Sequence, residues 1–127
     1  MKIYIAASWN DRETVKIISD QLSKYDIKTT CKWWTHEDAS CYSIYAIEDK
    51  KAIEECDIFI LYNTSLKTQG KMIEFGMAIS LEKKIVVIGE LITSVFRFFI
   101  DYEENYFSID SIVKRIYQIV LMESIKK

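Results

Sequence analysis

Proline is absent from this chain of 127 residues, and only three glycines are present. Because these residues usually interrupt secondary structure, the ends of helices and strands have to be predicted here from polar clusters and capping residues. The three cysteines form no C-x-x-C pair, and there is a single histidine. Such spacing is not typical of a disulfide framework or a structural zinc site, and we expect neither of them. We also expect no metal in the functional site. Cys31 and Cys56 are interpreted as small buried hydrophobic residues.

An excess of charge of one sign is also lacking. Seventeen basic and nineteen acidic side chains give a formal net charge of -2, whereas proteins that bind nucleic-acid phosphates usually carry a basic surface. Uncharged apolar runs such as Ile85–Gly89 are far shorter than the ~18–20 residues of a membrane span, and no apolar signal segment opens the chain. We therefore expect no nucleic-acid partner, no membrane association and a cytoplasmic location.

Half of the residues are hydrophobic, which is enough for one packed domain of the common ~100–150 residue size, and we predict a single domain over residues 1–127. Runs rich in β-branched and aromatic residues alternate with segments of helical spacing. The predicted strands are Lys2–Ala6, Asp26–Trp34, Asp57–Tyr62, Lys84–Gly89 and Asn105–Phe107. The predicted helices are Asp11–Tyr25, Ser43–Cys56, Gly70–Glu82 and Ser108–Lys126, with a short aromatic segment over Thr93–Ile100.

This alternation predicts an α/β fold: a flavodoxin-like or Rossmann-like three-layer sandwich with a parallel sheet of about five strands. Ligands of such sheets bind beyond the carboxyl ends of the strands, which here are followed by residues 7–11, 33–42, 63–70 and 89–94. The sequence contains neither G-x-G-x-x-G nor a P-loop, which excludes classical dinucleotide-binding proteins and P-loop NTPases. The third strand ends in Asn63 rather than an acid, so a response regulator is excluded too.

Two of the three glycines bracket a carboxylate in the segment from Gly70 to Ala78. A glycine at a helix start lets a ligand approach the backbone N–H groups, and Gly76 would permit close packing against a strand or a ligand. Glu74 would then point into the cleft. The alternative is that Glu74 only favours the helix N-terminus through the macrodipole, and spacing leaves both interpretations open.

These segments resemble the nucleoside 2-deoxyribosyltransferase family, which includes 2'-deoxynucleoside 5'-monophosphate N-glycosidases. The resemblance rests on Ile3–Ser8, Ile53–Leu61, the G-x-x-x-E-x-G element at residues 70–76 and Lys84–Gly89. It extends over nearly the whole chain.

The resemblance implies that Glu74 is a nucleophile that attacks the anomeric carbon of a 2-deoxyribosyl group and displaces the base. A carboxylate suits this reaction, since it stabilises an oxocarbenium-like transition state and can form a covalent glycosyl-enzyme. Water or a second base would then resolve the intermediate. Asp49 matches a family acid that contacts the sugar hydroxyl or assists proton transfer; the alternative for Asp49 is an exposed charge on a helix.

Family transferases usually carry an acid six residues before the nucleophile, and Thr68 stands there in this chain. The nucleotide hydrolases instead resemble this chain in having a hydroxyl residue there, which helps to hold a 5'-phosphate beside the backbone N–H of Gly70. The resemblance therefore favours hydrolysis of a nucleoside monophosphate, and it leaves the proton donor to the departing base unassigned.

Base and phosphate binding are implied for the first loop, at Ala7, Ser8, Trp9, Asn10 and Arg12. Arg12 could pair with a phosphate in a bidentate manner, or it could be a solvated charge on a helix. Trp34 is the favoured residue for stacking on the base, with a structural role for Trp33 and Trp34 as the alternative. His36 is the chain's only side chain that normally titrates near neutral pH, which makes it a candidate acid.

The resemblance implies no cofactor, a nucleoside or nucleoside monophosphate as substrate, and a homodimer or larger homo-oligomer. The aromatic residues of Phe96–Phe99, with Tyr102, Tyr106 and Phe107, either pack on the sheet edge or form a subunit contact. Two other functions stay open. One is a non-catalytic nucleotide-binding module, and the other is a glutamate-dependent glycohydrolase of NAD-like dinucleotides.

Overall fold

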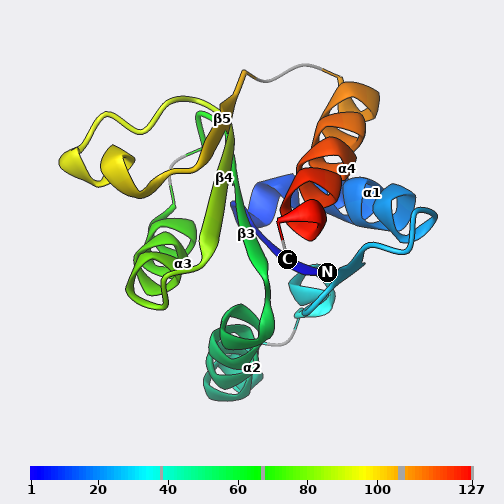
Figure 1. The fold of residues 1–127 in the computed structure, drawn as a ribbon. Coiled ribbons are helices and arrows are strands. Elements are labelled where there is room, and N and C mark those ends of the chain that lie inside the picture. The colour runs from blue at the N-terminus through cyan, green and yellow to red at the C-terminus, as the bar shows by residue number, and fades with distance from the viewer. Residues whose placement is uncertain (38, 67, 106–107, 127) are drawn as a thin grey trace.

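The computed structural model describes residues 1–37, 39–66, 68–105 and 108–126 (Figure 1). The strands are β1 (Lys2–Ala6), β2 (Lys28–Thr29), β3 (Ile58–Asn63), β4 (Lys84–Gly89) and β5 (Tyr102–Glu104). The α-helices are α1 (Arg12–Ser23), α2 (Tyr42–Glu55), α3 (Gln69–Ser80) and α4 (Ile109–Ile125). Short 3-10 segments are η1 (Trp9–Asp11), η2 (Trp33–Thr35), η3 (Ala39–Cys41) and η4 (Val95–Phe99).

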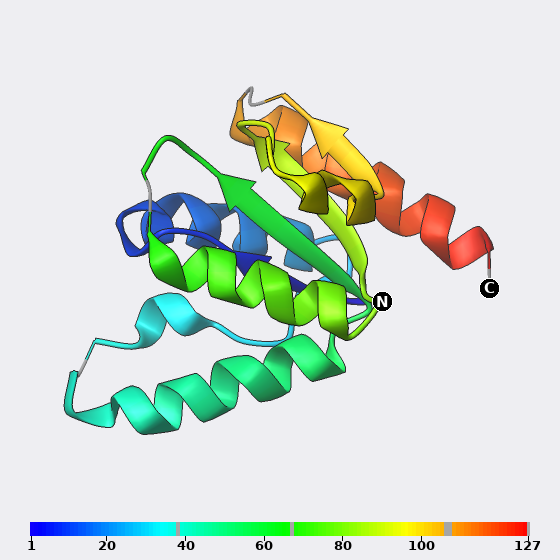
Figure 2. The ribbon, with the colours of Figure 1, turned by 90° about the vertical axis from the view of Figure 1, so that its left-hand side faces the viewer.

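The five strands form one parallel sheet in the order β2-β1-β3-β4-β5. Helices α1 and α4 cover one face and α2 and α3 the other, as Figures 1 and 2 show from two sides. Every residue of β3 is buried, as expected for a central strand covered on both faces. The predicted flavodoxin-like three-layer α/β sandwich is confirmed, and the strand order reverses between β1 and β3.

The second strand is much shorter than predicted. Only Lys28 and Thr29 pair with β1, while Trp33 and Trp34 lie in η2. The chain enters this strand from a turn at Asp26, whose φ of 61° is left-handed. Beyond the strand, the indole N–H of Trp33 donates a 2.6 Å hydrogen bond to the Ile5 carbonyl. The hydrogen bond to Ile5 holds Trp33 beside the sheet, although Trp33 does not pair with β1 as a strand residue.

The fifth strand precedes its predicted position. It spans Tyr102–Glu104, whereas Asn105–Phe107 was predicted, and residues 106 and 107 lie outside the described residues. The segment is anchored at Asp101, whose carboxylate accepts a 2.8 Å hydrogen bond from the backbone N–H of Ile85. Ser108 caps the start of α4, because its hydroxyl accepts a hydrogen bond from the backbone N–H of Ser111.

Gly76 and Gly89 differ in the space that a side chain would have at each position. A Cβ at Gly76 would meet no atom within 4 Å, so the expected close packing against a strand is wrong. Gly89 is the residue that must lack a side chain: its φ is +112°, and a Cβ would lie 2.3 Å from the carbonyl oxygen of Asn63.

Within the described ranges, no helix combines the length and the apolar character needed to cross a membrane.

Candidate active site

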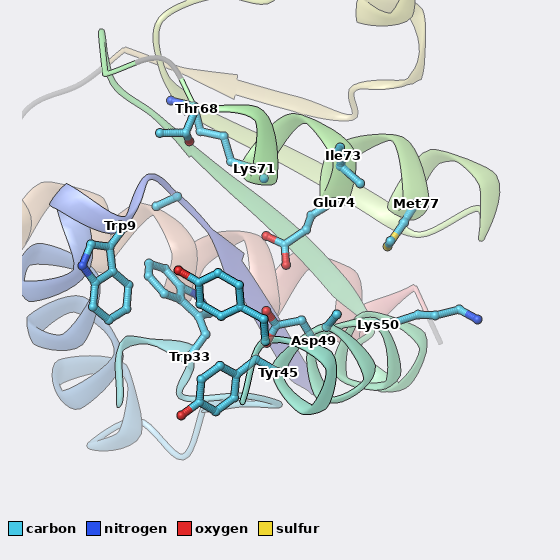
Figure 3. A pocket seen from close by; sticks show the side chains of 14 residues that line it. Trp9, Trp33, Tyr45, Asp49, Lys50, Thr68, Lys71, Ile73, Glu74 and Met77 are labelled. Atoms are coloured by element: carbon cyan, nitrogen blue, oxygen red, sulfur yellow. The ribbon is translucent and has the colours of Figure 1, made fainter. Parts of the chain in front are cut away.

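A cavity of about 580 Å³ lies beyond the carboxyl ends of β1 and β3, between α2 and α3 (Figure 3). This is the point at which the strand order reverses, where ligands of parallel sheets usually bind. Six of the predicted site residues line the cavity: Ala7, Trp9, Asp49, Thr68, Gly70 and Glu74. Trp33, for which Trp34 was favoured as the stacking residue, lines it as well.

Glu74 projects into the cavity from α3 (Figure 3). The helix begins at Gln69 and has no acidic residue in its first turn, so Glu74 lies beyond the turn on which the macrodipole acts most strongly. Its carboxylate accepts a hydrogen bond from the hydroxyl of Tyr4, a buried residue of β1. The hydrogen bond from Tyr4 holds the Glu74 side chain in the cavity, and the position of Glu74 on α3 does not suit a role in stabilising the helix N-terminus alone.

The pKa of Glu74 is raised to about 7, chiefly because the carboxyl group is buried. The hydrogen bond from Tyr4 opposes this shift in pKa by stabilising the ionised form, and the negative charge of Asp49 adds to it. A carboxylate that is half ionised near neutral pH, with a fixed hydrogen-bond donor, is typical of catalytic carboxylates.

Asp49 faces the same cavity from α2, so the two carboxylates enter it from opposing helices (Figure 3). It is partly buried, and the thiol of Cys31 donates a 3.4 Å hydrogen bond to its Oδ1 atom. Burial raises the pKa of Asp49, while the Cys31 hydrogen bond and His36 oppose the rise. Asp49 is therefore not the exposed helix charge that the sequence left as an alternative.

The loop before α3 is held by two side chains. Ser8 is buried, and its hydroxyl donates to the Leu66 carbonyl at 2.7 Å and lies 3.2 Å from the Thr68 hydroxyl. Lys71 is also buried, and its ammonium donates to the Leu66 carbonyl at 2.7 Å and to the Thr64 carbonyl at 3.3 Å. Burial lowers the pKa of Lys71. Ser8 thus positions Thr68, while Lys71 brings a cationic group to the wall of the cavity.

The other predicted residues of the first loop lie around Trp9. The Arg12 guanidinium lies 4.6 Å above the Trp9 ring and donates to the Trp9 carbonyl at 3.2 Å. Arg12 therefore supports a lining residue and does not line the cavity itself. Asn10 is exposed on η1 and is likewise outside the lining.

Of the two adjacent tryptophans, Trp33 lines the cavity and Trp34 does not. Trp34 is buried with its ring at an edge-to-face angle to Trp33, 5.7 Å between ring centroids. His36 also lies outside the lining, stacked on the ring of Tyr45, which does line the cavity. The structure thus presents four aromatic rings that a bound base could contact: Trp9, Trp33, Tyr42 and Tyr45.

Tyr4, Tyr45 and Lys71 were not among the predicted site residues. Tyr4 could have been found from the sequence, because a tyrosine within a short buried strand needs a hydrogen-bond partner for its hydroxyl. Tyr45 stands four residues before Asp49 on the same helix, and such residues share a face. Lys71 offered no signal, since a lysine near a helix start is ordinarily solvated.

Among solved structures, the chain is similar to the CMP N-glycosidase BcmB of Clostridium botulinum. The two are 19% identical, and the match covers 91% of this chain and 98% of the other, with a TM-score of 0.66. This chain has the fold of that enzyme. No protein-family model matches the sequence, and no curated protein matches it. The fold predicted from the alternation of strands and helices is therefore confirmed by a structural likeness over almost the full length.

Proposed function

We propose that this protein cleaves the N-glycosidic bond of a nucleoside 5'-monophosphate or a deoxynucleoside, with Glu74 as the nucleophile. The observation that carries the proposal is the placement of Glu74, partly buried, held by the Tyr4 hydroxyl and opposed by Asp49 across one cavity. The sequence resemblance to nucleoside 2-deoxyribosyltransferases and the fold of a nucleotide N-glycosidase agree with this chemistry, and we propose membership of that family.

In the proposed reaction, a Glu74 carboxylate oxygen forms a bond to the anomeric carbon while the bond from that carbon to the base nitrogen breaks. The electron pair of the broken bond leaves with the base, and the oxocarbenium-like transition state is stabilised by the carboxylate charge. A water molecule then attacks the anomeric carbon as the bond from that carbon to Glu74 breaks, which regenerates the carboxylate, and the proton that the water loses neutralises the departed base. Asp49 contacts the sugar or assists the proton transfers from its opposing position.

A phosphate would bind at the start of α3. The hydroxyl of Thr68, the backbone N–H of Gly70 and the buried ammonium of Lys71 are donors or charges on that side of the cavity. The name of the structural neighbour specifies CMP, which is a nucleoside monophosphate. Because Thr68 stands where the resemblance implies an acid in the transferases and a hydroxyl residue in the nucleotide hydrolases, we propose hydrolysis rather than transfer to a second base.

The test is base release from a panel of deoxynucleosides, their 5'-monophosphates and CMP, with and without a second free base, followed by chromatography. We expect free base from monophosphates, and Glu74→Gln should lower the rate by about 10³-fold or more while substrate still binds. Glu13→Gln, an exposed glutamate of α1 on the other face of the sheet, is the matched control.

Other outcomes of this assay would change the assignment. Exchange into the second base would make the protein a transferase. Turnover of NAD-like dinucleotides alone would favour the glycohydrolase alternative. Binding without turnover of any panel member would contradict the proposal and favour a nucleotide-binding module.

We also propose that the chain forms a homodimer or a larger homo-oligomer. The segment η4 exposes large apolar side chains, with Val95 83% and Phe98 85% exposed, and such residues on a surface often mark an interface. Light scattering should give a mass of at least two chains for the wild type and a single chain for Phe98→Ser. A wild-type mass of one chain over the concentrations of the activity assay would contradict this proposal.

A further inference from the structure

A second group of ligating side chains lies beside the candidate active site. Cys31 follows β2, His36 follows η2, and Asp49 belongs to α2, and one ligand atom of each lies within 4.8 Å of the others. All three residues are partly buried. Spacing along the sequence did not predict this group, because its members come from three separate segments that only the fold brings together.

We propose that Cys31, His36 and Asp49 bind a Zn²⁺ ion. Thiolate, imidazole and carboxylate are the ligands that zinc takes in proteins, and a tetrahedral ion separates such ligand atoms by about 3.4 to 3.6 Å. Here the Cys31 Sγ atom lies 3.4 Å and the His36 Nδ1 atom 3.9 Å from Asp49 Oδ1. The Asp49 oxygen therefore lies within a few tenths of an ångström of the tetrahedral separation from each of the other two ligand atoms, all three atoms lie within 4.8 Å of one another, and a fourth position is left for water.

The surroundings of His36 suit a metal ligand. Its Nε2 atom lies 3.3 Å from the carboxylate of Glu48, while Nδ1 is the nitrogen directed toward Asp49. Histidines that bind metals usually donate their second N–H to a carboxylate, which orients the ring. The ring is also stacked on Tyr45 at 4.0 Å and 3°. Stacking fixes the ring plane, with Nε2 beside Glu48 and Nδ1 directed toward Asp49.

The ion has a route from solvent. A depression of about 390 Å³ is lined by Cys31, His36 and Glu48, while Asp49 reaches the ligand group from the wall of the cavity that holds Glu74. Its rim carries two lysines and two glutamates, so it does not repel a cation through net charge: Lys32, Lys51, Glu48 and Glu55.

Binding involves no change of oxidation state. A bond forms between the Cys31 sulfur and Zn²⁺ as the thiol proton, which now points to Asp49, leaves to solvent. The thiolate and the Asp49 carboxylate together neutralise the two positive charges of the ion.

The test measures metal binding without reference to turnover. The full chain, first stripped with a chelator, is titrated with Zn²⁺ against a chromophoric chelator, and Co²⁺ is used as a spectroscopic substitute. We expect one ion per chain and a thiolate-to-cobalt absorption band. Cys31→Ser should abolish the band and weaken zinc affinity by about 100-fold, and Glu48→Gln should weaken it by about 10-fold.

Two variants separate loss of binding from loss of the fold. The Glu48 side chain is 53% exposed, so Glu48→Gln does not threaten folding. Cys41→Ser, a partly buried cysteine outside the group, should keep both the band and the affinity. No zinc binding by the wild type, binding unchanged by Cys31→Ser, a cobalt complex without the thiolate band, or an equal loss in Cys41→Ser would overturn the proposal.

Discussion

The hydrogen bond from Tyr4 to Glu74 should control how much of the proposed nucleophile is ionised at neutral pH. Tyr4→Phe removes the donor and keeps the ring, which stacks on Phe59 at 5.8 Å between centroids. A hydrogen bond to a charged group contributes about 1.5–3 kcal/mol. Because Tyr4 donates to the ionised carboxylate, its loss raises the pKa of Glu74 above its value of about 7.

The size of the effect follows from the lower end of that range. Removing about 1.5 kcal/mol from the ionised form changes the protonation equilibrium of Glu74 about 13-fold. The ionised fraction at pH 7 then falls from about one half to about 7%. Base release at neutral pH should therefore fall about sevenfold, and at about pH 9 it should return to within about a factor of two of the wild type.

The assay is the initial rate of base release from about pH 6 to about pH 9 for both proteins, with urea unfolding as a check on the fold. Tyr25→Phe, an exposed tyrosine after α1, is the matched control and should leave the profile unchanged. A loss of the same size at every pH, or no loss at neutral pH, would refute the reasoning. It would mean that the Tyr4 hydroxyl does not determine the ionisation of Glu74.

Three further predictions concern the wild type and other positions. Because Glu74 has a pKa of about 7 and must be ionised to attack, wild-type base release should rise about tenfold between about pH 6 and about pH 8, and a flat profile would contradict this. Gly89→Ala should lower the free energy of unfolding by about 1–3 kcal/mol in urea titrations, because its φ is +112° and the Asn63 carbonyl blocks a Cβ. Gly76→Ala, in an open helix position, should instead raise it by up to about 1 kcal/mol, and equal effects of the two changes would show that the backbone argument is mistaken. Thr68→Ala should raise KM for a monophosphate about tenfold and leave KM for the matching deoxynucleoside within about a factor of two; steady-state kinetics that show the same rise for both would exclude a phosphate contact.

Local patterns in the sequence were enough to predict the layers of the fold. The alternation of β-branched runs with helical spacing was confirmed in the parallel sheet, and Lys2–Ala6 and Lys84–Gly89 were predicted to the residue. Periodicity works here because it reflects which side of each element is buried, and that depends on neighbours only a few residues away. The same local information placed Glu74 on the helix after a buried strand, at the edge of the sheet where ligands bind.

Contacts between distant segments were decided by the tertiary structure. The bond that positions Glu74 comes from Tyr4, 70 residues away, and Trp33 rather than Trp34 lines the cavity because its indole is tied to the carbonyl of Ile5. Cys31 and Asp49 meet only because α2 packs beside the end of the short edge strand. Such pairings depend on strand order and helix packing, which bring together residues that share no spacing along the chain. The sequence by itself therefore determined which elements form and which carboxylate is a candidate nucleophile, whereas packing decided the partners that set its ionisation.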